Sequence, residues 1–263
     1  MNIVTCIKQV PSSSNVEINP ETGTLIRNSA AGKMNPFDLF ALECAVQMKE
    51  SCGAHITALT MGPPQSEKIL KEAFMMDADE AVLLTDRAFA GADVLATSYT
   101  LSQAIESLGK IDLIICGKQT TDGDTAQVGP AISEFLKIPH IANVSEIVEI
   151  SDTSITLYQE QSDKYRLLVN VPYPCLITVE KDICMVRLPS YNVGIKNKDK
   201  QIKTLTLADM PDKNPNNYGL LGSATQVERI FPPDDYNEKI NLDGENENIG
   251  KVLLEYLINT RAL

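Results

Sequence analysis

The residues best suited to chemistry lie in a loop of small and polar side chains that runs from Gly117 to Pro130, GKQTTDGDTAQVGP. This loop leaves an apolar segment at a glycine and opens a segment with helical spacing, which Asp124 or Thr125 can cap. The N–H groups and positive dipole at such a helix start suit a phosphate or diphosphate. The loop matches neither G-x-G-x-x-G nor a P-loop. From the residues alone, an anion site and an ordinary capped loop both remain open.

A second loop of the same character spans residues 86–93, DRAFAGAD. Its small residues leave room for a ligand, and Asp93 could cap the helix that follows. The alternative is a simple turn in which Phe89 packs inward.

Side chains for acid–base, nucleophilic or metal chemistry are sparse. The two histidines, His55 and His140, form no Ser/His/Asp pattern, and there is no nucleophile elbow. The six cysteines form no C-x-x-C pair, so we expect free thiols in a reducing cytoplasm and no metal centre. We predict no catalytic side chain, and any redox chemistry would have to come from a cofactor.

Composition excludes further classes. The 263 residues carry 23 Lys+Arg against 35 Asp+Glu, a net charge of −12, which is unsuited to binding a nucleic-acid backbone. No apolar stretch approaches the roughly 18–20 residues that a membrane span needs. The N-terminus lacks the basic and apolar regions of a secretory signal, so a cytoplasmic location is expected.

The elements that must position these loops alternate along the first two-thirds of the chain. Nearly continuous apolar runs favour strands buried on both faces, and therefore a doubly wound, mainly parallel α/β sheet of the Rossmann-like type. Its ligands would sit beyond the carboxyl ends of the strands. The spacing predicts strands at Ile3–Val10, His55–Met61, Glu80–Leu84 and Ile111–Cys116, and helices at Pro36–Glu50, Gln65–Met76, Ala92–Leu108 and Asp124–Leu136.

The pattern changes after about residue 145. Alternation at Ser154–Gln159 and Tyr165–Asn170 predicts an antiparallel hairpin, and a strand resumes at Cys175–Val179. Residues 187–245 lose periodicity, with only short apolar pieces such as Val227–Phe231, before an amphipathic helix at Ile249–Ile258. A structureless stretch of this length indicates a functional arm or a segment ordered on a partner, and a flexible tail is the alternative. We therefore divide the chain into an α/β domain, 1–186, and an extended C-terminal arm, 187–263.

Five segments of the chain carry a specific pattern: VTCIKQVP (4–11), MNPFDLFALECAVQMKE (34–50), TMGP (60–63), DRAFAGADVLATSYTL (86–101) and IDLIICGKQTTDGDTAQVGP (111–130). Together they closely resemble the beta subunit of electron-transfer flavoproteins. The match covers most of residues 1–195, and DGDTAQVGP is its most specific block. The resemblance implies a heterodimer with a flavin-carrying alpha subunit, and an adenine nucleotide on this chain. That nucleotide is AMP in housekeeping members and a second FAD in electron-bifurcating ones.

The same resemblance assigns the nucleotide contacts. Ser12 stands where the family often has Asp, so no contact is assigned to it. The implied set is Lys8, Gln9 and Val10 along the nucleotide, Asn35 and Asp38 at its adenosine side, Met61 near the adenine, and Gly117, Asp122, Gly123, Asp124, Thr125, Ala126, Gln127 and Val128 around ribose and diphosphate.

The AFAGAD segment resembles the electron-bifurcating branch, in which this loop borders an NADH site. Phe89, Ala90, Gly91 and Asp93 are then the candidates for NAD contacts. This branch implies that NADH gives a hydride to a FAD held mainly by this chain. One electron would pass to a low-potential acceptor such as ferredoxin, and the other, through the alpha-subunit flavin, to an acyl-CoA dehydrogenase or another flavin dehydrogenase. A housekeeping AMP-binding carrier and a stand-alone nucleotide sensor are the alternatives.

The segment 187–196, RLPSYNVGIK, resembles the family's recognition loop, which docks the partner dehydrogenase. Tyr191 takes the place of the exposed apolar anchor, with Val193 and Ile195 beside it and lysines following. A rigid aromatic anchor ringed by polar residues is typical of an interface hot spot.

Overall fold

The computed structural model describes residues 1–12, 17–18, 25–26, 32–162, 165–228 and 246–259. The chain divides into two compact units, Met1–Glu228 and Arg229–Leu263. In the described part of the second unit there is one helix, α7 (Asn246–Asn259), which confirms the helix expected at the C-terminal end. Nowhere in the described ranges does a helix combine the length and apolar character that a membrane crossing requires.

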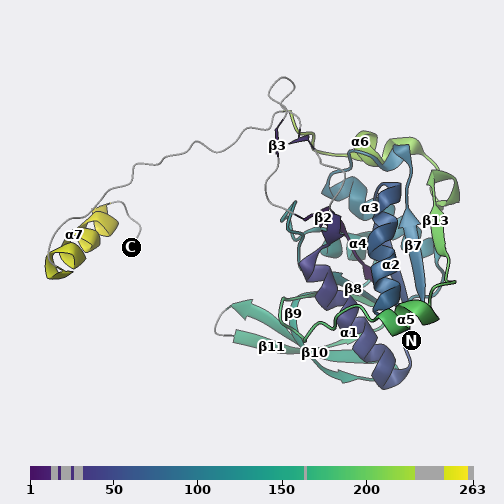
Figure 1. Ribbon diagram of the computed structural model, residues 1–263, viewed down its shortest axis with the longest axis horizontal. Coiled ribbons are helices and arrows are strands. Elements are labelled where there is room, and N and C mark those ends of the chain that lie inside the picture. The colour runs from purple at the N-terminus through teal and green to yellow at the C-terminus, as the bar shows by residue number, and fades with distance from the viewer. Residues whose placement is uncertain (13–16, 19–24, 27–31, 163–164, 229–245, 260–263) are drawn as a thin grey trace. The chain divides into compact units, whose positions relative to one another are not determined.

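Within the described residues, the first unit is built on a nine-stranded sheet in the order β11-β10-β9-β12-β8-β1-β6-β7-β13. Figure 1 shows β9, β10 and β11 together at one end of this sheet, and β7 and β13 at the other. The strands β9, β12, β8, β1, β6, β7 and β13 each pair in parallel with their neighbours in this set. At one end of the sheet, β10 pairs antiparallel with both β9 and β11. The strands are β1 (Asn2–Cys6), β6 (His55–Met61), β7 (Glu80–Leu84), β8 (Leu113–Gly117), β9 (His140–Ile150), β10 (Ser154–Ser162), β11 (Tyr165–Pro172), β12 (Cys175–Val179) and β13 (Ile202–Leu205).

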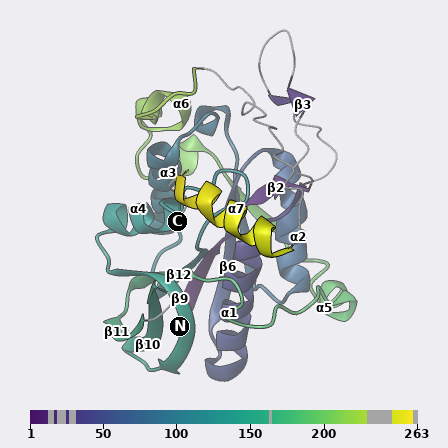
Figure 2. The same cartoon turned by 90° about the vertical axis from the view of Figure 1, so that its left-hand side faces the viewer.

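Helices cover both faces of this sheet because successive strand residues point to opposite faces. Ile3 belongs to the core under α1 and α2, whereas its neighbour Val4 belongs to the core under α3 and α4. Figure 2 shows the two pairs of helices on opposite sides of the strands. The doubly wound, mainly parallel sheet is therefore confirmed. The helices are α1 (Pro36–Cys52), α2 (Glu67–Met75), α3 (Val94–Ser107), α4 (Val128–Leu136), α5 (Tyr191–Lys196) and α6 (Gly219–Gly222).

One of two expectations about strands was only partly right. The predicted hairpin is confirmed as β10 and β11. The strand expected over Ile3–Val10 breaks after Cys6, because the chain leaves the main sheet there. Its last part forms β2 (Gln9–Pro11), which pairs antiparallel with β5 (Gly32–Met34). A second small pair joins β3 (Glu17–Ile18) and β4 (Leu25–Ile26).

The prediction that residues 187–245 lack structure was wrong over 187–228. This segment belongs to the first compact unit and supplies β13, which extends the sheet in parallel beside β7. Its Leu205, Met210 and Tyr218 are buried in the core under α3. These apolar pieces are too short to show a helix or strand periodicity in the sequence. The edge of β7 offers backbone hydrogen bonds, and pairing with it makes residues 202–205 a strand. Of the piece Val227–Phe231, only residues 227–228 lie within the described residues.

Candidate functional site

The chain reverses its direction across the sheet at β1. From β1 it proceeds through β6 to β7, and β8 then pairs on the other side of β1. The carboxyl ends of β1 and β8 therefore form the topological switch point, where open α/β sheets bind ligands. The first loop, which follows β1, and the fourth loop, which follows β8, meet there.

An ion pair joins these two loops. Lys8 Nζ lies 2.8 Å from Asp122 Oδ1, and both side chains are partly exposed. Burial opposes ionisation of Asp122, but the hydrogen bond and charge of Lys8 hold its pKa below the usual value. The site thus places a cation at its surface between the two loops.

Asn35 connects the same loops from beneath. It occupies the N-cap position of α1, yet its side chain forms no cap; Pro36 begins the helix. Asn35 Nδ2 donates to the carbonyl of Gln119 at 2.8 Å, and Asn35 Oδ1 accepts from the Thr121 N–H at 3.3 Å. Its own N–H donates to the carbonyl of Lys8 at 2.9 Å. This fully buried side chain therefore fixes the fourth loop relative to the first.

Asp38 and Gly117 form the floor of the site. Asp38 is buried, and its Oδ2 accepts from the Lys8 N–H at 2.7 Å. Burial raises the pKa of Asp38 to about 7, although hydrogen bonds from Asn35, Lys8 and Gly117 and the charge of Lys8 oppose the shift. A Cβ on Gly117 would fall 2.4 Å from Asp38 Oδ1 and 2.7 Å from the Phe37 carbonyl carbon, so this close approach requires glycine.

The fourth loop adopts an uncommon backbone. Asp124 and Ala126 have φ of 52° and 54°, a left-handed conformation that costs non-glycine residues energy and recurs at functional sites. The helix expected to start at Asp124 starts instead at Val128, because those angles are incompatible with a right-handed helix. The expected cap from Asp124 or Thr125 was therefore wrong. Gln127 is the N-cap residue, and no side chain caps α4. Residues 121–127 are exposed around this helix start.

Comparison with known proteins shows the family to which the chain belongs. A family model described as the electron transfer flavoprotein domain matches residues 22–210. The chain is 46% identical over 229 residues to the electron transfer flavoprotein subunit beta of Clostridium acetobutylicum, covering 87% of each chain. It belongs to the electron transfer flavoprotein beta subunits.

Two further relatives have other names. Over 234 residues, 42% are identical to subunit CarD of the caffeyl-CoA reductase-Etf complex of Acetobacterium woodii, covering 89% of this beta subunit and 88% of CarD. Over 245 residues, 39% are identical to the protein FixA of Sinorhizobium fredii, and the match covers 91% of this beta subunit and 86% of FixA. The family is associated with flavin, and its beta subunits pair with alpha subunits.

The remaining nucleotide candidates of the beta subunit lie at the same edge of the sheet. Gln9 Oε1 accepts from the Ser66 hydroxyl at 3.1 Å, which ties the first loop to the second, after β6. Met61 is half-buried at the end of β6, and Val10 is buried. The structure thus brings the first, second and fourth loops together, whereas contacts with a nucleotide stay predictions.

The third loop of the beta subunit, after β7, is largely occupied by protein contacts. Phe89 is only 4% exposed and packs against Tyr218, with ring centroids 5.5 Å apart, so the inward turn is confirmed. Asp93 caps α3 as expected, accepting from the Ala96 N–H at 3.0 Å, and it also accepts from Thr225. Of the four NAD candidates, Ala90 and Gly91 are exposed.

The sequence reasoning missed residues that shape these loops. Gln119 donates to Asp124, and Thr120 Oγ1 accepts from the Gly123 N–H at 3.4 Å. The segment 218–225 covers the third loop, since the Leu220 N–H donates to the Ala90 carbonyl at 2.9 Å. Gln119 and Thr120 could have been noticed as polar residues directly after a strand. The covering segment carries no comparable signal.

The docking candidates form part of helix α5. Tyr191 is 76% exposed and Ile195 is also exposed, whereas Val193 is half-buried. The helix is held to α2, because the Ser190 N–H donates to the Met75 carbonyl at 3.0 Å and Asn197 Nδ2 donates to the Phe74 carbonyl at 2.9 Å. The beta subunit therefore presents an aromatic side chain from an anchored helix.

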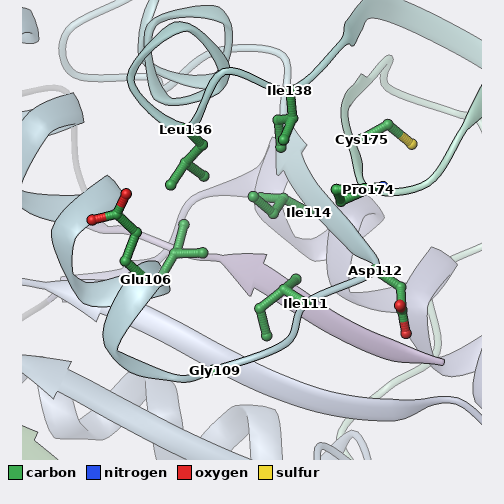
Figure 3. Close-up of a pocket in the computed structure, with 10 residues that line it drawn as sticks. Glu106, Gly109, Ile111, Asp112, Ile114, Leu136, Ile138, Pro174 and Cys175 are labelled. Atoms are coloured by element: carbon green, nitrogen blue, oxygen red, sulfur yellow. The ribbon is translucent and has the colours of Figure 1, made fainter.

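A cavity of about 170 Å³ lies at the opposite, amino edge of the sheet. Figure 3 shows its apolar walls, which come from the ends of α3 and α4 and from the chain entering β8 and β12. Ile111, Ile138 and Leu136 line it, and the carboxylates of Glu106 and Asp112 lie at its side. It is separate from the loops of the switch point.

Proposed function

We propose that this chain is the beta subunit of an electron-bifurcating electron transfer flavoprotein, and that it binds a FAD through the adenine-nucleotide part. The observation that carries the site is the meeting of the first and fourth loops at the switch point. The Lys8–Asp122 ion pair and the Asn35 bridge hold them there.

The residues present fit an adenine diphosphate. Lys8 offers a cation, and the left-handed turns at Asp124 and Ala126 leave an exposed backbone before the uncapped start of α4. Such a helix start favours an anion through its N–H groups and dipole. Gly117 allows close approach at the floor of the site. The nucleotide would lie over this floor, between the first and fourth loops.

The chemistry that the flavin supplies when bound is acceptance of a hydride from NADH, followed by release of single electrons. This chain contributes position, shielding from water and charge. No side chain of the subunit serves as a catalytic acid or base in this proposal. Asp38 and Asn35 keep the first loop and fourth loop in register, and Lys8 orients the phosphates.

A bifurcating beta subunit would have two electron acceptors. One electron goes to a low-potential acceptor such as ferredoxin, and the other goes through the alpha-subunit flavin to an acyl-CoA dehydrogenase or another flavin dehydrogenase. The relative CarD, named for a complex with a reductase, supports a dehydrogenase partner. Tyr191 and Ile195 supply the exposed contact that such a partner would use. We propose that the complex works in the cytoplasm.

NADH would approach along the third loop. Ala90 and Gly91 are exposed in this loop, although the Ala90 carbonyl already accepts from the Leu220 N–H. Phe89 and Asp93 would act by shaping the loop. A housekeeping role is the alternative, because a site for diphosphate also accepts the phosphate of AMP. In that case the subunit would hold AMP and would not react with NADH.

The test is the nucleotide content of the complex co-expressed with its alpha subunit. We expect two FAD per heterodimer, both bleached when NADH is titrated under anaerobic conditions. One FAD with one AMP, and no bleaching, would refute bifurcation and leave the housekeeping carrier.

A variant pair tests the site itself. Lys8→Met should lower occupancy of the nucleotide on this subunit, whether it is FAD or AMP. Lys110→Met is the matched control, because Lys110 is an exposed lysine at the amino edge whose Nζ lies 3.5 Å from Asp112. If the Lys8 variant kept its full content of nucleotide, binding of the nucleotide at the switch-point site would be refuted.

A further inference from the structure

Two cysteines far apart in sequence meet on one side of the sheet. Cys44 lies in α1 and is buried, and Cys184 follows β12 and is half-buried. Their Sγ atoms are 3.8 Å apart, and Cys184 Sγ also lies 3.8 Å from the carbonyl oxygen of Phe40. Formation of a disulfide requires the sulfurs to approach to about 2.05 Å.

The chain around Cys184 can supply that movement. Residues 180–190 form neither helix nor strand, so Cys184 is not held by a ladder of backbone hydrogen bonds. A second pair, Cys6 and Cys116, occupies opposed positions on neighbouring strands, where both residues are fixed within the sheet. Of these two pairs, Cys44 and Cys184 is the one in which one sulfur can move toward the other.

The hydrogen bond between the two thiols favours a nucleophilic sulfur on Cys184. A hydrogen bond from the Cys44 thiol lowers the pKa of Cys184 and the nearby Arg187 lowers it further, against burial and the charge of Glu43. The contact with Cys184 and burial raise the pKa of Cys44. Arg187 itself is fixed by Glu43, with Nε 2.8 Å from Oε2. The thiolate is the reactive form of cysteine, and cationic neighbours promote it.

We propose that Cys44 and Cys184 form a reversible disulfide when the protein meets a peroxide, and are free thiols otherwise. In the first step the Cys184 sulfur bonds to a peroxide oxygen, the O–O bond breaks, and hydroxide leaves and takes a proton as water. This yields a sulfenic acid. The Cys44 sulfur then loses its proton and attacks the Cys184 sulfur; the S–S bond forms, the S–O bond breaks, and a second water leaves. The two thiols give up two electrons, and the peroxide becomes two waters.

The cross-link would fasten the segment that leads to α5. Arg187, three residues beyond Cys184, already binds Glu43 and Glu50 of α1 through its guanidinium. The disulfide would add a covalent attachment beside these ion pairs. Such transient bonds are the form in which disulfides occur in reducing compartments.

The test maps the cross-link in the full-length chain, in complex with its alpha subunit. The complex is treated with hydrogen peroxide, free thiols are alkylated under denaturing conditions, and peptides are analysed by mass spectrometry. We expect a cross-linked peptide containing Cys44 and Cys184, two hydrogens lighter than its parts and lost on reduction with dithiothreitol. On a non-reducing gel the oxidised chain should migrate faster, because the loop from residue 44 to residue 184 is closed.

Variants separate this pair from general oxidation. Cys184→Ser should abolish the cross-link and the gel shift, whereas Cys52→Ser should leave both unchanged. Cys52 lies on the same helix and is exposed, with its thiol donating to the Met48 carbonyl. Separate alkylation of Cys44 and Cys184 in the peroxide-treated wild-type chain would overturn the proposal. So would a cross-link from Cys184 to another cysteine.

Discussion

Replacement of Asp38 by asparagine tests the electrostatics at the floor of the switch-point site. Asp38 is buried, and its pKa is raised from 3.8 to about 7. The folded chain therefore binds this proton more tightly than the unfolded chain does. The stability that this provides is fully present below pH 3.8 and is lost as the pH rises to about 7. Asparagine cannot ionise, so Asp38→Asn removes this dependence.

The size of the effect follows from the shift. About three pKa units correspond to about 4 kcal/mol. Between pH 3.8 and about pH 5 the aspartate ionises in the unfolded chain but not in the folded one. About 1.6 kcal/mol of the stabilisation is therefore already lost by about pH 5. The free energy of unfolding of the wild type, relative to Asp38→Asn, should therefore fall by about 2–3 kcal/mol between about pH 5 and about pH 8.

Urea unfolding of the full-length chain at several pH values measures this difference. The difference in free energy of unfolding between the two proteins is taken at each pH, so that the titrations of all other groups cancel. A cost of the substitution that does not depend on pH leaves the slope of this difference against pH unchanged. Asp152→Asn is the control, since Asp152 is an exposed residue in the turn before β10. Parallel pH curves for the wild type and Asp38→Asn would show that the buried carboxylate has no raised pKa, and would refute the reasoning.

Three other substitutions have defined outcomes. Arg187→Met should lower the free energy of unfolding by about 3 kcal/mol in urea, because it leaves the buried Glu43 carboxylate without its partner; Glu43→Gln in the same chain should restore part of it. Gly117→Ala should reduce the bound nucleotide measured after purification, because its Cβ would lie 2.4 Å from Asp38 Oδ1; unchanged occupancy would contradict the close approach. Tyr191→Ala should weaken binding to the partner dehydrogenase by about 30-fold, as for a 2 kcal/mol hot spot, with no change in thermal unfolding. Equal affinities in a biosensor assay would exclude Tyr191 as the anchor.

The sheet and the place of the site could be predicted because both depend on local patterns. Apolar runs such as His55–Met61 specify buried strands, and the carboxyl ends of parallel strands meet at one edge of a sheet. The family resemblance assigned Lys8 and Asp122 to one site, and the structure brings them into contact. Capping of α3 by Asp93 could be predicted for the same reason, since a cap acts within one turn.

What could not be predicted depends on partners distant in sequence. β13 has only four residues, and it is a strand because the edge of β7 is available. Asn35 precedes Pro36 as a helix cap should, but its side chain is used by Gln119 and Thr121 instead. The late start of α4 follows from backbone angles that the residue types at Asp124 and Ala126 do not demand.

The position of β12 has a consequence for the order in which the molecule is assembled during synthesis. β12 is made after β9, β10 and β11, yet it lies between β8 and β9 in the sheet. A nascent chain that has not reached residue 179 therefore cannot join β9 and the hairpin to the strands made before them. The start of the fourth loop also lacks a hydrogen-bond partner until then, because the Lys118 N–H donates to the carbonyl of Val179 at 3.0 Å. The ligand site thus matures only after about two-thirds of the sequence has left the ribosome, and a chain cut before Cys175 would retain every fourth-loop residue without that anchor.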